Sequence, residues 1–403
     1  MARTKILTLV MAGGAGGRMD LLTDVRAKPA LPFAGVYRLI DIPLSNCVHS
    51  GLSDIWIVEQ FQPQTLNDHL ANGRPWDLDR TYGGLRLLPP FTGTSESGWH
   101  RGNADALYRN RRFIREFAPD LLLVLSADHL YKLDYWRAID AHLSADADVT
   151  MVTAQVPREE VGRFGNVRVD GQGRVTEFVY KPDEPLSETV TTEVFVYRCN
   201  RLMDLIDELA ADGAADSEEG LKDYGHDLLP ALVREGRAYA LPLDGYWRDV
   251  GTIDSYWQAH MDLLAPEPPL DLDDPHWPIL TYGTQRVPAR ILDTARIDQS
   301  LIAPGCRVAG LVERSVLGPG VVVEPGAHVR EAVIFGGTTV EAGARVERAI
   351  VDSGVRIGAR AQVGGQDNDR PLDQQIVLVG QRALVEANAQ IKPGARIKPA
   401  EQD

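Results

Sequence analysis

The sequence is poor in cysteine and in positive charge. Its three cysteines, Cys47, Cys199 and Cys306, are widely spaced and odd in number, so they form neither a disulfide framework nor a zinc-binding pattern. This use of cysteine predicts a reducing, cytoplasmic location. Lys and Arg number 42 against 57 Asp and Glu, a formal charge of −15. We therefore expect no general binding to nucleic acid or to an anionic membrane, because both need a basic face.

Long hydrophobic runs are also missing. The run Ile6–Ala12 is too short to span a bilayer. Two basic residues precede it and small residues follow it, a weak version of a secretory signal peptide. We prefer the interpretation as a buried first strand, because cleavage would waste the glycine-rich loop that comes next.

What the sequence does contain is length enough, at 403 residues, for two domains with cores of their own. Up to about residue 264, short apolar runs alternate with amphipathic stretches, which predicts a mostly parallel sheet covered by helices on both faces. The predicted strands are Ile6–Met11, Ile55–Val58, Leu121–Leu125 and Val149–Val152, and the predicted helices are Leu44–His49, Ala104–Phe117 and Tyr135–Leu143. Ligands of such sheets bind at the carboxyl ends of the strands.

A proline-rich, acidic stretch then predicts a linker over residues 265–290. Beyond it, Gly-x-x-Val/Ile recurs, often at six-residue spacing, with aliphatic residues in phase. That period predicts a parallel β-helix over residues 291–403 rather than a β-sandwich. No candidate catalytic group lies there, so we expect this domain to serve assembly or regulation.

The first chemical motif is the loop after the first strand. The dinucleotide fingerprint fails at Met19, and the P-loop pattern fails because Arg18 follows Gly17. What remains is a glycine-rich backbone that can wrap a phosphate chain, with Arg18 to neutralise it. Arg26 and Lys28 offer two further cations nearby.

Two carboxylates complete the pattern. Asp128 follows the apolar run Leu121–Leu125, and Asp249 precedes a glycine. Together with a phosphate-binding loop they predict a Mg²⁺–nucleotide site. The alternative for Asp128 is a helix N-cap. Lys181 is expected either to hold a second phosphate or to be a surface lysine at the end of a hairpin.

These residues, in this order, make the chain resemble the bacterial glucose-1-phosphate adenylyltransferase family. The matching stretches are "MAGGAGGR", "RAKPALPFAGVYRLIDIPLSN", "WHRGNADAL", "SADHLYKLDY", "RFGNVRVD", "EFVYKP", "YWRDVGT" and "HWPI". The resemblance implies an α/β fold, a mostly parallel Rossmann-like nucleotidyltransferase sheet followed by a left-handed parallel β-helix. It also implies an enzyme that joins a nucleoside triphosphate to a sugar 1-phosphate, with Mg²⁺, and releases pyrophosphate.

The resemblance further implies roles for individual residues. Arg18, Lys28 and Asp128 would be catalytic, and Asp128 and Asp249 would bind the metal. The nucleotide would contact Gly13, Gly14, Gly16, Arg18, Lys28, Gly102 and Asp128. The sugar phosphate would contact His100, Gly165, Tyr180, Lys181, Thr191 and Glu193.

The chain departs from the family where sugar and base would be recognised. His100 stands where the family has Tyr, Tyr180 where it has Glu, and the Pro89–Gly93 and Thr191–Glu193 stretches differ. Val36 replaces a lysine associated with activator binding, which puts control by fructose 1,6-bisphosphate in doubt.

The sequence thus predicts a homo-oligomeric enzyme, dimer or tetramer, that uses ATP and glucose 1-phosphate. Two alternatives stay open at this point. One is the same chemistry with another base or acceptor, for example a cyclitol 1-phosphate as in a valienol-1-phosphate guanylyltransferase. The other is a catalytically silent regulatory subunit, against which the presence of Arg18, Lys28, Asp128, Lys181 and Asp249 argues.

Overall fold

The computed structural model describes residues 4–90, 99–211, 221, 223–234, 236–283, 285–367 and 370–399. By compactness the chain divides into two units. Unit 1 comprises residues 1–15, 42–63 and 70–247, and unit 2 comprises residues 16–41, 64–69 and 248–403. The division falls inside the glycine-rich loop, between Ala15 and Gly16. The N-terminal segment after Ala15 therefore belongs with the C-terminal part of the chain.

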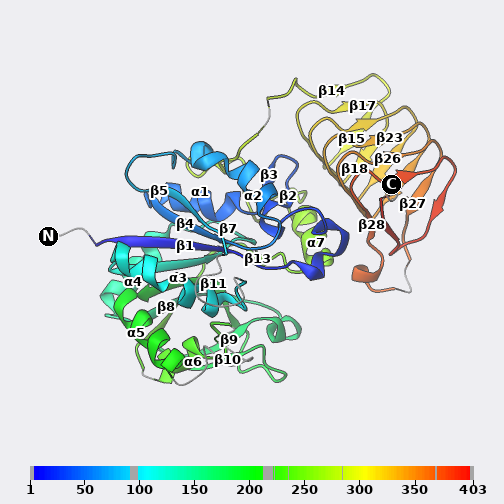
Figure 1. Cartoon of the computed structure of the whole chain (residues 1–403). Coiled ribbons are helices and arrows are strands. Elements are labelled where there is room, and N and C mark those ends of the chain that lie inside the picture. The colour runs from blue at the N-terminus through cyan, green and yellow to red at the C-terminus, as the bar shows by residue number, and fades with distance from the viewer. Residues whose placement is uncertain are drawn as a thin grey trace. The chain divides into compact units, whose positions relative to one another are not determined.

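Unit 1 is built on a nine-stranded sheet in which β10, β9, β11, β6, β1, β4 and β5 lie side by side, with β8 between β11 and β12 (Figure 1). The strands are β1 (Ile6–Ala12), β4 (Asp54–Glu59), β5 (Gly84–Leu88), β6 (Leu121–Ser126), β8 (Val149–Gln155), β9 (Gly165–Val169), β10 (Val175–Tyr180), β11 (Thr189–Arg198) and β12 (Ala238–Pro242). The short β7 (His129–Tyr131) follows β6. Strands β6, β1, β4 and β5 are parallel, as the sequence predicts, whereas β11 runs antiparallel to β6, β8 and β9.

Helices cover this sheet because their apolar stripes match its aliphatic faces. Side chains of α3, α5 and α6 share one core with alternate residues of β1, β6 and β11, among them Leu7, Leu9 and Val124. The helices of this unit are α1 (Asp41–His49, whose first residue lies in unit 2), α3 (Asn103–Phe117), α4 (Tyr135–Ser144), α5 (Cys199–Leu209) and α6 (Leu228–Arg234). All strands and helices predicted from periodicity in this unit are confirmed, with boundaries that differ by a few residues.

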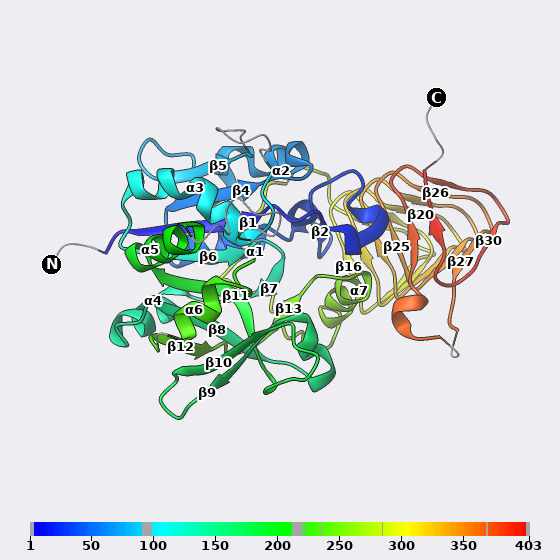
Figure 2. The same ribbon diagram turned by 60° about the horizontal axis from the view of Figure 1, so that its bottom comes forward.

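Unit 2 contains the predicted parallel β-helix, three six-stranded parallel sheets stacked coil upon coil (Figure 2). The first sheet holds β14 (Arg290–Ile291), β17 (Arg307–Val308), β20 (Val322–Val323), β23 (Thr339–Val340), β26 (Arg356–Ile357) and β29 (Leu384–Val385). The second holds β15 (Arg296–Asp298), β18 (Leu311–Glu313), β21 (His328–Arg330), β24 (Arg345–Glu347), β27 (Gln362–Gly364) and β30 (Gln390–Ile391). The third holds β16 (Leu301–Ile302), β19 (Val316–Leu317), β22 (Val333–Ile334), β25 (Ala349–Val351), β28 (Val377–Val379) and β31 (Arg396–Ile397).

The in-phase aliphatic residues form the core of this β-helix. Val308, Val323, Val340 and Ile357 pair in register from coil to coil and are buried. One coil cannot bury its own apolar residues, so stacking supplies the core. Among the described residues between Asp262 and Arg290, where we expect the linker, no helix or strand is present.

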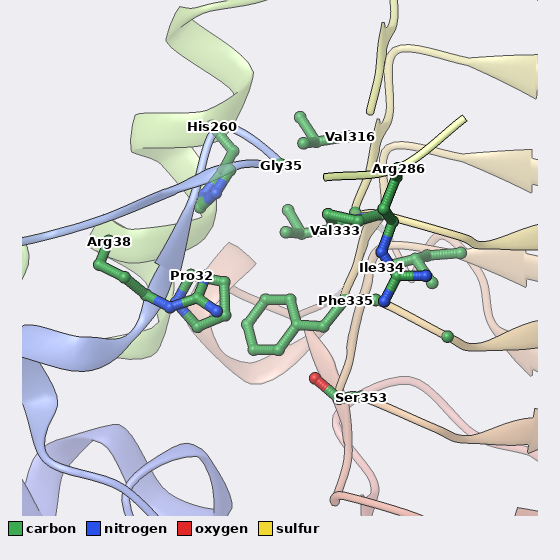
Figure 3. A pocket seen from close by; sticks show the side chains of 14 residues that line it. Pro32, Gly35, Arg38, His260, Arg286, Val316, Val333, Ile334, Phe335 and Ser353 are labelled. Carbon is green, nitrogen blue, oxygen red and sulfur yellow. The ribbon is translucent and has the colours of Figure 1, made fainter. Parts of the chain in front are cut away.

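The rest of unit 2 holds short elements from two parts of the chain. It comprises β2 (Pro32–Phe33), β3 (Tyr37–Arg38), most of α2 (Pro63–Leu70) and α7 (Ile253–Asp262), while β13 (Trp247–Asp249) begins in unit 1. Thr252 and Ser255 form a capping box at the start of α7. Tyr256 of this helix packs edge-on against both His260 and Phe335, so the helix and the β-helix share an aromatic contact. Figure 3 shows Phe335 extending from the β-helix toward Pro32 of the N-terminal segment.

No helix within the described ranges is long and apolar enough to cross a membrane. All three cysteines are buried and unpaired.

Candidate active site

The carboxyl ends of β1 and β6 form one edge of the sheet in unit 1. Met11 of β1 is paired with Ser126 of β6 in the parallel ladder. Gly13 and Gly14 follow β1 by one and two residues, and Asp128 follows β6 by two. The first glycines of the loop and the first candidate carboxylate therefore leave the sheet side by side.

Asp128 lies between β6 and β7. The Ser126 hydroxyl donates a hydrogen bond to Asp128 Oδ1, and His129 Nε2 lies 3.7 Å from the same oxygen. The nearest helix downstream is α4, which begins at Tyr135 with Asp134 as its N-cap. The N-cap alternative for Asp128 is therefore wrong, and its carboxylate belongs to a strand end.

The glycine-rich backbone beside it faces partly open space. A Cβ added at Gly14 would meet no atom within 4 Å, whereas one at Gly13 would lie 3.6 Å from Gln60 Cβ. The Gln60 side chain holds the main chain of His100: its amide donates to the His100 carbonyl at 3.0 Å and its oxygen accepts from the His100 amide at 2.6 Å. Gly102 is the N-cap residue of α3. His100 and Gly102 are thus placed on the Gln60 side of the glycine loop.

His100 itself has a half-buried imidazole. Burial lowers its pKa, with a smaller opposing effect from Asp105. The ring is therefore neutral at physiological pH, and an uncharged ring recognises a ligand by hydrogen bonding and packing rather than by charge.

The second half of the loop belongs to unit 2, where Gly16 has φ +68°, a left-handed conformation that favours glycine. The Thr23 hydroxyl donates to the Gly16 carbonyl at 3.0 Å, and a Cβ at Gly16 would lie 2.9 Å from Thr23 Cγ2 and 3.3 Å from Lys28 Cβ. Gly16 is therefore packed directly against the segment that carries Lys28. Arg18, two residues after Gly16, is exposed.

Arg26 does not present its charge to a ligand, contrary to the sequence-based expectation. Its guanidinium is buried and makes a bidentate ion pair with Asp352, with both N–O distances 2.8 Å. A buried guanidinium paired in this way is a structural group. The partner is more than three hundred residues away, so no sequence pattern reveals it.

Five of the six residues assigned to the sugar phosphate line one small cavity in unit 1, and they are Gly165, Tyr180, Lys181, Thr191 and Glu193. The sixth, His100, is not among the described residues that line it. Gly165 is required for this packing, because a Cβ there would lie 2.8 Å from Thr191 Oγ1 and 2.9 Å from the Phe178 ring.

Lys181 ends the β9–β10 hairpin, as the sequence predicts, and its main chain is in the left-handed region at φ +47°. Its ammonium lies 4.5 Å from the centre of the Tyr180 ring. Lys181 is exposed, as the surface alternative predicts, and it also lines the cavity. Its contact with a second phosphate stays a prediction.

Sequence reasoning missed the opposite wall of the cavity, formed by Asp223, Tyr224 and Gly225. The Tyr180 hydroxyl donates a hydrogen bond to Asp223 Oδ2. The Tyr180 ring lies over Gly225, where an added Cβ would come within 2.1 Å of Cδ2 of the ring. The signal was an acidic residue next to Tyr-Gly ahead of α6, which is too common a pattern to be recognised without its spatial neighbours.

Glu193 stands at an irregularity of β11. Its φ is +56°, and the register of β11 on β8 shifts between Thr191 and Phe195. Val194 pairs with Leu125, so Glu193 lies next to the end of β6 that leads to Asp128. A non-glycine residue held in this region is strained, and such strain clusters at functional sites.

Asp249 is the last residue of β13 and is half-buried. A Cβ at Gly251 would lie 2.6 Å from Asp249 Oδ2, so the carboxylate lies close over the Gly251 main chain. Of the Pro89–Gly93 stretch, residues 91–93 lie outside the described residues.

The comparisons with known proteins agree with this arrangement. A family profile described as "Nucleotidyl transferase" matches residues 7–265, and one described as "GlmU-like, C-terminal hexapeptide" matches residues 287–385. The chain belongs to the nucleotidyl transferase family, and it is a nucleotidyltransferase enzyme.

Three relatives within this family show which of its members the chain is similar to. The chain is 40% identical over 325 residues to the glucose-1-phosphate adenylyltransferase of Thermosipho melanesiensis, covering 81% of this chain and 78% of the relative. It is 42% identical over 328 residues to that of Pseudothermotoga lettingae, covering 81% and 76%. It is 39% identical over 333 residues to that of Bacillus thuringiensis, covering 82% and 87%. The resemblance inferred from the motifs is confirmed.

Proposed function

We propose that this enzyme joins a nucleoside triphosphate to a sugar 1-phosphate, and that ATP and glucose 1-phosphate are its pair, giving ADP-glucose and pyrophosphate. A phosphate oxygen of the sugar 1-phosphate attacks the α-phosphorus, a new P–O bond forms, and the bond to the β-phosphate breaks with loss of pyrophosphate. The observation that carries the proposal is the shared edge of β1 and β6, where a glycine-rich backbone and the Asp128 carboxylate adjoin.

The residues do complementary work in this reaction. Gly13, Gly14 and Gly16 present main-chain amides to the triphosphate, while Arg18 and Lys28 neutralise its charge. Such transfers depend mainly on positioning and on neutralising charge, with little covalent work for the protein. Gly102 and His100 border the nucleotide loop through Gln60.

The acceptor occupies the cavity of unit 1. Lys181 and the Gly165 main chain hold its phosphate, and Tyr180, Thr191 and Glu193 contact its hydroxyl groups. This assignment rests on the convergence of five residues from three stretches of the chain on one cavity. Because these polar groups need partners when a ligand excludes water, they discriminate between acceptors that do and do not supply matching hydroxyls.

We propose Mg²⁺ as the cofactor, with Asp128 and Asp249 as its protein ligands. Carboxylate oxygens are the hard donors that this ion prefers, and one or two of them suffice where phosphate oxygens and water complete its shell. When bound, the ion would neutralise the negative charge that develops on the leaving pyrophosphate. Asp128 is held in one orientation by the Ser126 hydroxyl, which fits a ligand role.

A panel assay tests the substrate assignment. Pyrophosphate release is measured with each of the four nucleoside triphosphates against glucose 1-phosphate, other hexose 1-phosphates and a cyclitol 1-phosphate. We expect ATP with glucose 1-phosphate to give the highest kcat/KM. A higher value for GTP with the cyclitol would assign the chain to the alternative acceptor, and no turnover with any pair would indicate a regulatory subunit.

We also propose that the enzyme acts as a homo-oligomer, dimer or tetramer. The proposal rests on the likeness to the family and on the presence of the β-helix, which carries no candidate catalytic group. Light scattering of the purified protein measures the mass directly.

A further inference from the structure

The N-terminal segment Gly16–Asp41 is part of the same compact unit as the β-helix. It carries Arg18 and Lys28, which the proposed function assigns to the triphosphate. The β-helix carries no candidate catalytic group of its own.

The strongest connection between the two is the ion pair between Arg26 and Asp352. Arg26 is 8% exposed to solvent, and Asp352 is completely buried. Both guanidinium nitrogens of the pair contact the carboxylate at 2.8 Å, and Arg26 Nη1 also donates to the Leu22 carbonyl at 3.1 Å. A bidentate pair fixes direction as well as distance, because the planar guanidinium matches the carboxylate in one orientation.

Asp352 is itself held rigidly. It follows β25, its amide donates to the Val379 carbonyl of the next coil at 2.9 Å, and its carbonyl accepts from the Thr338 hydroxyl at 2.8 Å. The Ser353 amide donates to Asp352 Oδ1. The carboxylate is therefore a fixed point of the β-helix.

From Arg26 the connection continues to the phosphate residues. Lys28 is two residues further on, and the intervening Ala27 amide donates to the Thr65 hydroxyl of α2 at 3.1 Å. Lys28 and Thr23 both pack against Gly16, as described above. A shift of Arg26 would consequently disturb the conformation of the whole stretch from Gly16 to Lys28.

A second, weaker tether holds the same stretch at its other end. Arg396 of β31 donates from Nε to Asp20 Oδ2 at 2.6 Å, and Asp20 has a non-helical main chain with φ 51° and ψ −137°. This pair is partly exposed, so on its own it contributes little. It nevertheless shows that two separate coils of the β-helix contact the segment.

We propose that Asp352 is a positioning residue for nucleotidyl transfer: through Arg26 it preorganises the segment that presents Arg18 and Lys28 to the triphosphate. The β-helix thereby takes part in catalysis without touching substrate. This inference rests on the proposed function, since it needs those two cations to bind the nucleotide.

The experiment separates positioning from stability. Replacing a buried ion pair by apolar residues of similar volume is often neutral or stabilising, whereas removing one partner is strongly destabilising. We therefore compare Asp352→Asn with the double variant Arg26→Met/Asp352→Leu. For each variant we measure the thermal unfolding temperature and the KM for each substrate. Calorimetry gives the Kd of the triphosphate in the absence of the sugar phosphate.

We expect Asp352→Asn to lose both stability and activity. The double variant should regain the unfolding temperature of the parent but keep a KM and a Kd for the triphosphate about tenfold higher, because displaced cations make weaker charge-assisted contacts with the phosphates. The KM for the sugar phosphate should change far less. A double variant as stable and as active as the parent would overturn the proposal.

Two further variants complete the design. The control is Arg348→Met/Glu331→Leu, a partly buried ion pair within the β-helix with an N–O distance of 2.9 Å, whose removal should leave both KM values unchanged. Arg26→Lys keeps the buried positive charge but loses the bidentate contact. This variant tests the proposal if the double variant does not fold. It should raise the KM for the triphosphate several-fold, and a folded Arg26→Lys protein with the parent KM would also overturn the proposal. An inactive parent protein would instead contradict the proposed function.

Discussion

Met11 of β1 and Ser126 of β6 are paired across a parallel ladder, and this pairing sets the phosphate loop beside the candidate metal ligand. In a parallel sheet all carboxyl ends meet at one edge, so residues more than a hundred positions apart become neighbours. The hydrogen bond from Ser126 to Asp128 then orients the carboxylate at that edge.

Asp128→Asn should abolish most of the activity and raise the Mg²⁺ concentration needed for half-maximal rate. A neutral amide is a poorer ligand for a hard dication, and lost electrostatic stabilisation costs about 10²–10³ in kcat. The measurement is a Mg²⁺ titration at saturating substrates. Asp134→Asn is the matched control: asparagine can still accept the capping hydrogen bond at the start of α4, so both the stability and the titration should stay close to those of the parent. An unaltered activation curve for Asp128→Asn would remove this residue from the metal site.

Gly225→Ala should weaken binding of the sugar phosphate. The added methyl would come within 2.1 Å of the Tyr180 ring, which must move and break its hydrogen bond to Asp223. We expect the KM for the sugar phosphate to rise about tenfold, with the KM for the triphosphate unchanged. Gly171→Ala in the β9–β10 turn, where a Cβ meets no atom within 4 Å, is the control. Equal effects on both KM values would argue against a role of Tyr180 in acceptor recognition.

Glu193→Gly should stabilise the protein while impairing its activity. Glycine adopts φ +56° without strain, so the free energy of unfolding should rise by about 1 kcal/mol. Loss of the carboxylate should raise the KM for the sugar phosphate. Gln299→Gly relieves similar strain at φ 40° in the β-helix and should stabilise without affecting either KM. A Glu193→Gly enzyme with unchanged kinetics would show that the strained glutamate has no part in recognition.

His260→Gln should reduce acid sensitivity. The ring is neutral in the fold: Nδ1 donates to the Tyr256 carbonyl at 2.9 Å and Nε2 accepts from the Ala34 amide at 3.2 Å, and burial lowers the pKa to about 4. Below the ordinary value of 6.5 the unfolded chain takes up a proton that the folded one refuses, so stability falls as the pH is lowered from 7.

At about pH 5 this effect is worth roughly 2 kcal/mol. Chemical denaturation at pH 7 and pH 5 measures it: the loss on acidification should be smaller in His260→Gln than in the parent. His276→Gln, which changes an exposed imidazole, should behave as the parent does. Identical pH dependence of the parent and His260→Gln would mean that the folded protein binds a proton at His260 as readily as the unfolded chain does.

Much of the fold could be predicted because its signals are local. The run Leu121–Leu125 is apolar throughout since both faces of a parallel strand are buried, and the six-residue glycine period marks the coils of the β-helix. The glycine loop could be recognised from composition alone, and Gly16 indeed occupies a conformation that glycine favours. Periodicity and backbone preference are properties of neighbouring residues, so the sequence by itself determines them.

Only the tertiary structure decided which separated side chains meet. The sequence suggested Arg26 as a phosphate ligand, but in the structure it is buried and paired with Asp352. Asp223 and Gly225 could be assigned to the cavity only because the hairpin places the Tyr180 ring over Gly225 and its hydroxyl on Asp223. The physical reason is that an ion pair or a cavity wall depends on distance in space, and a chain hundreds of residues long leaves that distance open until its sheets and coils have packed.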